Sequence, residues 1–323
     1  MMFKAGLRIL AGAVLSGALG VSAAQAYPDS AVTLITPFPA GGATDVLART
    51  LVETMGTHFG QTLVVDNRPG ATTNIGASQA TRAKPDGYTL FLATNSTLVT
   101  NRYLYQKLPY DPDGFAPIGM IGVGPMVLLA NPQHGFKTLE DVVAKARANP
   151  GELTIASFGA GSSSHLAAQY LQQVAGIELL HIPYKGSTEA MPQLIAGETD
   201  LFFDMVSTGM PQVDAGKVDV VAITSPKRMS VLPDIPTVAE QGYPGFEMTA
   251  WFTLVAPPAT PESITDVVTK ALGDALADEG LRERIAKMGI EPADGSRQAL
   301  LDQIEKEKPV IQRLVKEANI AVQ

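Results

Sequence analysis

The sequence predicts an α/β fold of two domains, each a mainly parallel sheet flanked by helices, with two crossing segments that form a hinge. Short β-branched runs alternate with segments of helical period, which is typical of strands covered by helices. This alternation begins near residue 32 and restarts near residue 126. No low-complexity linker separates the two halves, so we expect the chain to cross between them on extended segments.

The first half predicts a βαβαβ unit. Leu47, Leu51 and Met55 recur at a spacing of four and mark one apolar face of its first helix. Consecutive βα units of this kind form a parallel sheet. The predicted elements are strands at 32–36, 62–66 and 88–94 and helices at 43–58 and 74–83.

The second half predicts further strands, at 126–130, 153–157, 179–183, 200–206 and 218–225. Its first helix is expected to begin at the capping-box-like Thr138–Asp141 and to end at residue 149. Two more helices are expected over 164–175 and 187–196. The inward face of the helix over 164–175 is formed by Leu166, Tyr170, Leu171 and Val174. Pro192 predicts that the last of these is kinked or starts late. Three C-terminal helices are predicted at 262–277, 279–288 and 296–319, the first capped by Thr260 and the last interrupted by Pro309.

Two apolar segments are suited to cross between the domains, residues 118–130 and 248–256. Two crossings make the first domain discontinuous and leave a cleft around the hinge. We therefore expect residues 27–123 and 252–323 to form domain 1, and residues 124–251 to form domain 2.

The first 26 residues have the three parts of a secretory signal peptide. Lys4 and Arg8 give a cationic start, residues 9–23 are uncharged and apolar, and Ala24-Gln25-Ala26 is a cleavage motif. A membrane anchor is the alternative, but the apolar run is short for a span and contains Gly and Ser. We expect cleavage after Ala26, so that the mature chain begins at Tyr27 and is exported to the periplasm.

Composition excludes several classes of function. The formal net charge is −8, and loss of Lys4 and Arg8 with the signal peptide makes it −10. An acidic chain without a basic cluster argues against nucleic acid or anionic lipid as a partner. Cysteine is absent, which excludes disulfides and thiolate chemistry. Four histidines lie scattered without ligand spacing, so we expect no metal. We also expect no cofactor and a monomeric protein.

The strongest local signal for binding is Pro37–Asp45, between the first predicted strand and helix. Gly41 and Gly42 let the backbone approach a ligand closely. The first N–H groups of a helix lack intrahelical partners and, with the helix dipole, form an anion site, to which Thr44 adds a hydroxyl. The alternative is an ordinary glycine-containing turn capped by Thr44 or Asp45.

A second loop of this kind is Phe158–His165, after a strand of the other domain. Small residues and hydroxyls at a helix start again suit an anion, and both loops lie at the carboxyl ends of strands, where open α/β sheets bind ligands. A phosphate-binding loop would need Gly-Lys-Ser/Thr, and a nucleophile elbow would need G-x-S-x-G. His165 could act as a general base, although a packed or capping histidine is the more common case.

Weaker candidates follow other strands. Asn95 and Ser96 could line the cleft or cap a turn, Tyr184 and Lys185 offer an aromatic wall and a cation, and Asp204 could accept a hydrogen bond or hold its loop. Asp66–Arg68 suggests a bracing ion pair, and Trp251 suggests core packing. The candidate ligand-binding residues are thus Phe38, Gly41, Gly42, Ala43, Thr44, Asn95, Ser96, Phe158, Ala160, Gly161, Ser162, Ser163, Tyr184, Lys185 and Asp204.

Several motifs, in order between Phe38 and Gly242, resemble the Bug, or TctC-type, family. Its members are the extracytoplasmic solute-binding components of tripartite tricarboxylate transporters. The motifs are Pro37–Asp45, Val65–Gly70, Lys84–Leu90, Leu108–Pro112, Pro183–Gly186, Gly197–Asp200 and Leu232–Thr237 with Glu240–Gly242.

The resemblance implies a type II-like periplasmic binding protein fold that closes over a small organic carboxylate and catalyses nothing. It implies that Gly41–Thr44 and Ala160–Ser163 hold a ligand carboxylate, partly through water, and that the partners are membrane transporter subunits, bound transiently. Family ligands range from citrate and acidic amino acids to nicotinate-type acids and aromatic dicarboxylates. Phe158 and Phe203, bulky beside the expected pocket, favour a flat aromatic acid.

Two other functions stay open at this stage. One is a secreted hydrolase in which Ser162 or Ser163 acts with His165. The other is a sensor subunit that presents its closed form to a membrane partner.

Overall fold

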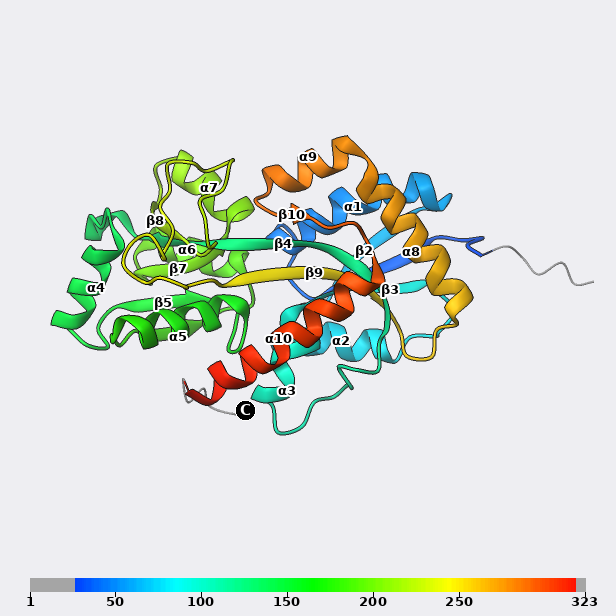
Figure 1. The fold of residues 1–323 in the computed structure, drawn as a ribbon, viewed down its shortest axis with the longest axis horizontal. Coiled ribbons are helices and arrows are strands. Elements are labelled where there is room, and N and C mark those ends of the chain that lie inside the picture. The colour runs from blue at the N-terminus through cyan, green and yellow to red at the C-terminus, as the bar shows by residue number, and fades with distance from the viewer. Residues whose placement is uncertain (1–26, 318–323) are drawn as a thin grey trace, which may run out of the picture.

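The structure, a computed structural model, describes residues 27–317 and has two lobes (Figure 1). The predicted signal peptide lies outside the described residues. Lobe 1 contains the parallel strands β1, β2 and β3, and lobe 2 contains the parallel strands β5, β6 and β7. Both belong to one curled ten-stranded sheet, in which β4 and β9 run from one lobe toward the other. The strands are β1 (Val32–Thr36), β2 (Leu63–Asn67), β3 (Thr89–Thr94), β4 (Ala116–Ala130), β5 (Thr154–Ser157), β6 (Leu180–Pro183), β7 (Leu201–Met205), β8 (Asp219–Ile223), β9 (Thr249–Ala256) and β10 (Glu291–Pro292).

The two predicted crossing segments are confirmed as β4 and β9. Residues 116–125 of β4 pair antiparallel with β9, and residues 126–130 then pair with β7 and β8 of lobe 2. One strand therefore belongs to both lobes. The α/β fold is confirmed, and the crossing strands add antiparallel pairs between the two parallel parts.

Helices cover both lobes. Lobe 1 has α1 (Ala43–Phe59), α2 (Asn74–Thr81), α3 (Asn101–Leu104), α8 (Glu262–Ala277), α9 (Glu279–Lys287), α10 (Arg297–Glu317) and the π-helical turn η1 (Ser96–Thr100). Lobe 2 has α4 (Leu139–Ala148), α5 (Ser163–Ala175), α6 (Ser187–Ala196), α7 (Val206–Asp214) and the 3-10 turn η2 (Pro132–His134). The capping box of α4 is confirmed, because Thr138 and Asp141 exchange hydrogen bonds with each other's backbone.

Several local predictions were wrong. Helix α6 begins at Ser187 despite Pro192, because the burial of its apolar face outweighs the missing N–H. The sequence did not predict α7, which contains Pro211. Thr260 does not cap α8, because its hydroxyl donates to the carbonyl of Pro257. The N-cap residue of α8 is Pro261.

Two further helix predictions also need correction. Val174 on α5 is 40% exposed, whereas Leu166 and Leu171 on the same helix are fully buried. Helix α10 runs without a break through Pro309.

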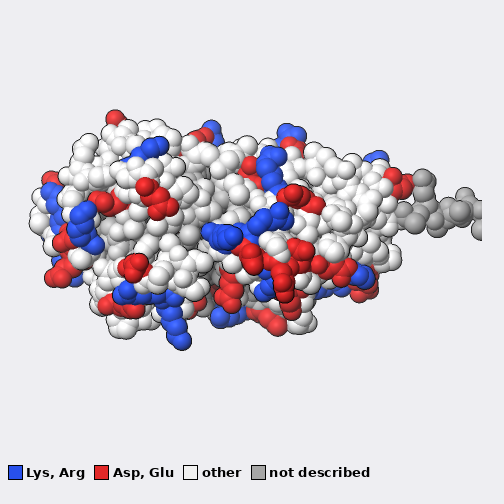
Figure 2. Space-filling view, turned by 90° about the horizontal axis from the view of Figure 1, so that it is seen from above, with Lys and Arg blue, Asp and Glu red and all other residues white. Residues whose placement is uncertain are grey.

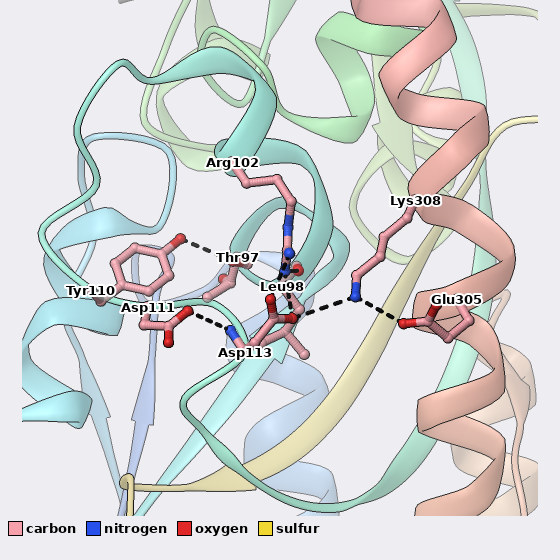
Figure 3. Close-up of polar contacts among 8 residues, drawn as sticks. All are labelled: Thr97, Leu98, Arg102, Tyr110, Asp111, Asp113, Glu305 and Lys308. Atoms are coloured by element: carbon pink, nitrogen blue, oxygen red, sulfur yellow. Dashed lines mark hydrogen bonds and ion pairs between the residues drawn. The ribbon is translucent and has the colours of Figure 1, made fainter.

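The C-terminal helix completes lobe 1. Asp113, which follows α3, receives hydrogen bonds at 2.8 and 2.9 Å from Arg102, and Lys308 on α10 lies 3.5 Å from the same carboxylate (Figure 3). Such half-exposed ion pairs contribute little stability. A buried contact lies behind them, in which the Trp251 indole and Asn95 donate hydrogen bonds to Glu307 of α10.

One face of the molecule carries charged side chains of both signs. On the face seen from above, Lys and Arg side chains are interspersed with Asp and Glu and form no continuous basic area (Figure 2). None of the helices within residues 27–317 is long and apolar enough to span a membrane.

Two histidines that the sequence separates are stacked in lobe 2. The rings of His165 on α5 and His181 on β6 lie 3.8 Å apart at 16°. The N–H of Gly161 donates to Nδ1 of His165, and Nε2 of His181 lies 2.6 Å from Oγ of Ser157. Burial lowers the pKa of His165 to about 3 and that of His181 to about 4, and the neighbouring ring adds to the effect at His165. The pair is therefore neutral in the folded protein.

This pair predicts a specific pH dependence of stability. The unfolded histidines bind protons below about pH 6.5, whereas the folded ones bind them only near pH 3–4. The stabilisation by the neutral pair is complete above about pH 6.5 and is lost as the pH falls toward 4. His181→Phe keeps the stack but removes one titrating group. Chemical unfolding should show that the wild type loses on the order of 1–3 kcal/mol relative to this variant between pH 7 and 4.

The matched control is His58→Phe, at an exposed histidine near the end of α1. Its stability difference from the wild type should not change with pH in the way that the His181→Phe difference does. Equal pH dependence of the two differences would contradict the assignment.

Candidate ligand-binding site

A cavity lies between the lobes, where the two parallel parts of the sheet face each other. It contains about 470 Å³ of empty space, part of it open to solvent. We call it the inner cavity. Its walls are formed by Phe38, Pro39, Gly42, Ala43, Thr44, Thr94, Asn95, Ser96, Phe158, Ser163, Gly186, Ser187, Met205, Ala250 and Phe252.

The start of α1 forms the lobe 1 side of the inner cavity. Gly42 is the N-cap residue and makes no side-chain cap, and Ala43 and Thr44 open the helix. The N–H groups of this first turn have no partner within the helix and lie at its positive end. Gly41, which the sequence analysis included, is not part of the wall, because its N–H donates to Asp45 at 2.9 Å.

A bracing network holds this turn from behind. Asp45 is buried and accepts hydrogen bonds from Arg49 at 3.0 Å and from Asn67 on β2 at 2.9 Å. Burial works to raise the pKa of Asp45, but the hydrogen bonds from Arg49, Gly41 and Asn67 lower it below its usual value. Asn67 also donates to the carbonyl of Phe38. The sequence analysis predicted the Arg68–Asp66 ion pair, which is present at 2.9 Å, but missed the role of Asn67.

The start of α5 lies on the lobe 2 side, where Phe158 and Ser163 of the predicted loop line the inner cavity. Ser162 is the N-cap of α5, and its hydroxyl donates to the carbonyl of Gly159 at 2.7 Å. The N–H of Gly161 donates to His165. Gly161 and Ser162 make these contacts within the turn and are not among the wall residues of the inner cavity.

Two more helices begin at the inner cavity. The sequence analysis predicted a helix over 187–196 but did not assign its start to the site, and it did not predict α7. Gly186 and Ser187 lead into α6, and Met205 is the N-cap residue of α7. A strand followed by glycine and serine was a usable signal for α6. Pro211 inside α7 obscured its helical pattern. Asp204 does not line the cavity; it lies directly behind Ser187, which donates to it at 2.8 Å.

The end of β3 supplies hydroxyl and amide groups from lobe 1. Asn95 and Ser96 line the inner cavity, and the Asn95 amide is fixed by Glu307 at 3.3 Å. Thr94, at the end of the same strand, also lines it. The Thr94 side chain is almost fully buried, and its Oγ1 has no hydrogen-bond partner among the described residues. An unpaired buried hydroxyl beside a cavity is available to a bound solute.

Three phenylalanines provide the apolar part of the wall. Phe38 from lobe 1 and Phe158 from lobe 2 meet edge to face at 6.3 Å, and Phe252 lies on β9. Phe203 does not contribute, because it points into the fully buried sheet of lobe 2 and pairs with Leu128 on β4. The aromatic preference therefore rests on Phe38, Phe158 and Phe252.

An outer pocket lies on the other side of the Phe38–Phe158 contact. Ala160, Tyr184 and Lys185 line it rather than the inner cavity, and Lys185 pairs with Glu189 at 3.4 Å. Thr72 of lobe 1 donates to the carbonyl of Ala160 across the cleft at 2.8 Å. The predicted site residues are thus divided between an inner cavity and its outer neighbour.

The electrostatics of the inner cavity come from backbone dipoles. No Asp, Glu, Lys, Arg or His is among its wall residues within the described chain. Four helices of nine or more residues begin at the wall, α1 from lobe 1 and α5, α6 and α7 from lobe 2. Each helix start carries roughly half a positive charge. The arrangement can hold an anion without a cationic side chain.

The contacts do not form a hydrolase dyad. Ser162 donates to a carbonyl, and Nδ1 of His165 is occupied by the N–H of Gly161. His165 also stays unprotonated over the ordinary pH range because burial lowers its pKa to about 3. Between residues 27 and 317, no group of three or more His, Asp or Glu side chains could hold a metal ion.

Comparison with known proteins agrees with this geometry. The model of a family described as the tripartite tricarboxylate transporter family receptor, TctC, matches residues 47–320. The structure of periplasmic binding protein BugD is 36% identical with a TM-score of 0.87, and the match covers 92% of this chain and 100% of that chain.

Two similar structures contain ligands. Rpa4515 of R. palustris with adipate is 34% identical with a TM-score of 0.89, over 91% of this chain and 99% of that chain. MatC (Rpa3494) from Rhodopseudomonas palustris with bound malate is 30% identical with a TM-score of 0.84, over 90% of this chain and 100% of that chain. The chain therefore belongs to the Bug/TctC family of solute-binding proteins and has their two-domain periplasmic binding protein fold, as the sequence motifs predicted.

Proposed function

We propose that this protein captures a small organic dicarboxylate in the inner cavity and delivers it to a tripartite tricarboxylate-type transporter. One observation carries the proposal: four helix starts, drawn from both lobes, meet at a cavity whose wall has no charged side chain. Helix N-termini bind anions through free N–H groups and the helix dipole. The adipate and malate bound by two relatives support a dicarboxylate as the ligand class.

The shape of the wall favours a solute with two polar ends and an apolar middle. The start of α1 and the starts of α5 and α6 come from opposite lobes, and Phe38, Phe158 and Phe252 provide apolar surface. The middle of the ligand is therefore an aliphatic chain or an aromatic ring. Thr94 and Ser96 can donate hydrogen bonds to the carboxylate on the lobe 1 side.

The rest of the proposal concerns organisation and location. Residues 27–123 with 252–323 form one domain and residues 124–251 the other, and they close over the ligand as a hinged pair. Cleavage after Ala26 releases the mature protein into the periplasm. There it acts as a monomer that binds membrane transporter subunits transiently and carries out no catalysis.

The first test is ligand-dependent thermal stabilisation of the purified mature protein. A ligand that binds only the folded state stabilises it by about 2.7 kcal/mol at a concentration 100 times the Kd. Adipate, malate, citrate, nicotinate and terephthalate form the panel, and their fully amidated forms are the matched neutral controls. We expect at least one dicarboxylate to raise the melting temperature and its diamide not to do so. A panel without any stabilising acid would contradict the proposal.

The second prediction concerns Gly42→Val. Gly42 has a φ of −79°, which valine adopts, and its new Cβ would lie 3.3 Å from the Pro39 carbonyl oxygen. The added side chain obstructs the approach of an anion to the N–H groups of Ala43 and Thr44. Titration calorimetry should show a loss of dicarboxylate affinity of at least about tenfold. The melting temperature without ligand should stay close to that of the wild type, and unchanged affinity would exclude this turn from the site.

The third prediction concerns closure and uses Gly186→Ala. Gly186 is extended, with φ 165°, so alanine is tolerated by the backbone. Its Cβ would lie 3.1 Å from Cδ of Pro39 in the opposite lobe. Overpacking of this kind costs on the order of 1 kcal/mol in the closed state, or about fivefold in affinity. Gly273→Ala on α8 is the matched control, since its Cβ has ordinary space, and it should bind like the wild type.

A further inference from the structure

Asp204 is a fully buried carboxyl group directly behind the wall of the inner cavity. It is the penultimate residue of β7 and has no exposed surface. Its Oδ1 accepts the N–H of Met205 at 2.8 Å, and its Oδ2 lies 2.8 Å from Oγ of Ser187. Ser187 lines the inner cavity, so one hydroxyl connects the buried carboxyl to the space that the ligand occupies.

No cation offsets the charge of Asp204. The elements packed against β7 carry few titratable groups: Glu189 on α6, His165 and Tyr170 on α5, and Asp214 on α7, with none on β4 or β5. Glu189 is paired with Lys185, His165 is stacked on His181, and Asp214 is exposed. None of these groups forms an ion pair or hydrogen bond with Asp204 among the described contacts. Burial therefore dominates and raises the pKa of Asp204 to about 7, against the opposing hydrogen bond from Ser187.

The proton on this carboxyl decides what Ser187 offers to a ligand. When Asp204 is ionised, the Ser187 hydroxyl donates to Oδ2, and its oxygen can only accept a hydrogen bond from the cavity. When Asp204 is protonated, Oδ2–H donates to Oγ of Ser187, and the Ser187 hydroxyl hydrogen is free to turn toward the cavity. Both arrangements fit the same 2.8 Å separation.

An anionic ligand favours the second arrangement for two reasons. A carboxylate only accepts hydrogen bonds, so it gains a donor when Ser187 turns toward it. Two negative carboxylates that share a poorly solvated site also repel each other, and such pairs hold a proton more tightly. Both effects act in the same direction.

We propose that Asp204 is a positioning residue that takes up one proton from water when a carboxylate binds, and so turns the Ser187 hydroxyl into a donor for the ligand. This inference rests on the proposed function, since it assumes a carboxylate in the inner cavity. At higher pH the ionised Asp204 leaves Ser187 as an acceptor. The site then discriminates less against solutes that present a hydroxyl or ammonium group at this point.

The experiment is titration calorimetry of the mature protein with adipate and with malate, in buffers of different ionisation enthalpy, between pH 7 and 8.5. Free carboxylates are fully ionised in this range, so any protons taken up bind to the protein. We expect uptake that approaches one proton per ligand toward the upper end of the range. The affinity should fall with pH, by up to tenfold per unit.

The variant Asp204→Asn tests whether the proton that is taken up binds to Asp204. Its amide Nδ2 can donate permanently to Ser187, while its Oδ1 still accepts the N–H of Met205. We expect this variant to bind with the affinity of the wild type near pH 7, with no proton uptake and no dependence on pH up to 8.5. Asp214→Asn, the same substitution at the exposed end of α7, should keep the wild-type proton uptake. A purely structural role of Asp204 would not change the number of protons.

The outcomes separate the two proposals. Binding of adipate or malate without proton uptake by the wild type overturns the role of Asp204 and leaves the proposed function intact. Proton uptake that persists in Asp204→Asn assigns the proton elsewhere and also overturns it. If the variant does not fold, binding without proton uptake by the wild type still overturns the role of Asp204. If no carboxylate binds at any pH, the proposed function fails, and this inference fails with it.

Discussion

The convergence of helix N-termini on a buried space is the constraint on which the rest of the structure depends. Each start leaves N–H groups without intrahelical partners and a partial positive charge. Such ends are costly inside a protein unless water, a side chain or a ligand satisfies them. Here Ser162 caps α5, but α1, α6 and α7 have no side-chain cap. These unsatisfied donors are what an anion can bind.

The fold is arranged to create this convergence. In a parallel sheet, all carboxyl ends lie at the same edge, and the following helices begin there. β1, β5, β6 and β7 each lead into a helix whose start reaches the cavity, and β3 leads into η1 beside it. The crossing strands β4 and β9 hold the two parallel parts so that their carboxyl edges face each other. Interactions remote from the cavity, such as Trp251 with Glu307, fix the wall by anchoring Asn95.

Much of this architecture could be predicted from the sequence, because strand and helix periods are local and strong. The two glycine- and serine-rich turns were also visible, since small residues directly after a strand are uncommon without a reason. The helix over 187–196 was predicted, but the place of its start in the cavity wall was not. Helix α7 was missed because Pro211 contradicts its helical propensity. The sequence also did not show which N–H groups of each turn are used within the protein. The N–H groups of Gly41 and Gly161 donate to Asp45 and His165. Such exchanges depend on side-chain directions that spacing does not encode, as does the stacking of His165 on His181.

A site made of neutral donors suits a protein that must release what it binds. An arginine would keep its charge when the lobes separate and would continue to attract the anion. The partial charges of helix ends fall off within about one turn and are weakened by water. One of the four helix starts belongs to lobe 1 and three belong to lobe 2. Opening of the proposed hinge would separate a bound anion from the helix starts of one lobe and admit solvent to both sides. Under the proposed function, the free energy of binding is coupled to closure, because a ligand that contacts both lobes shifts the population toward the closed state.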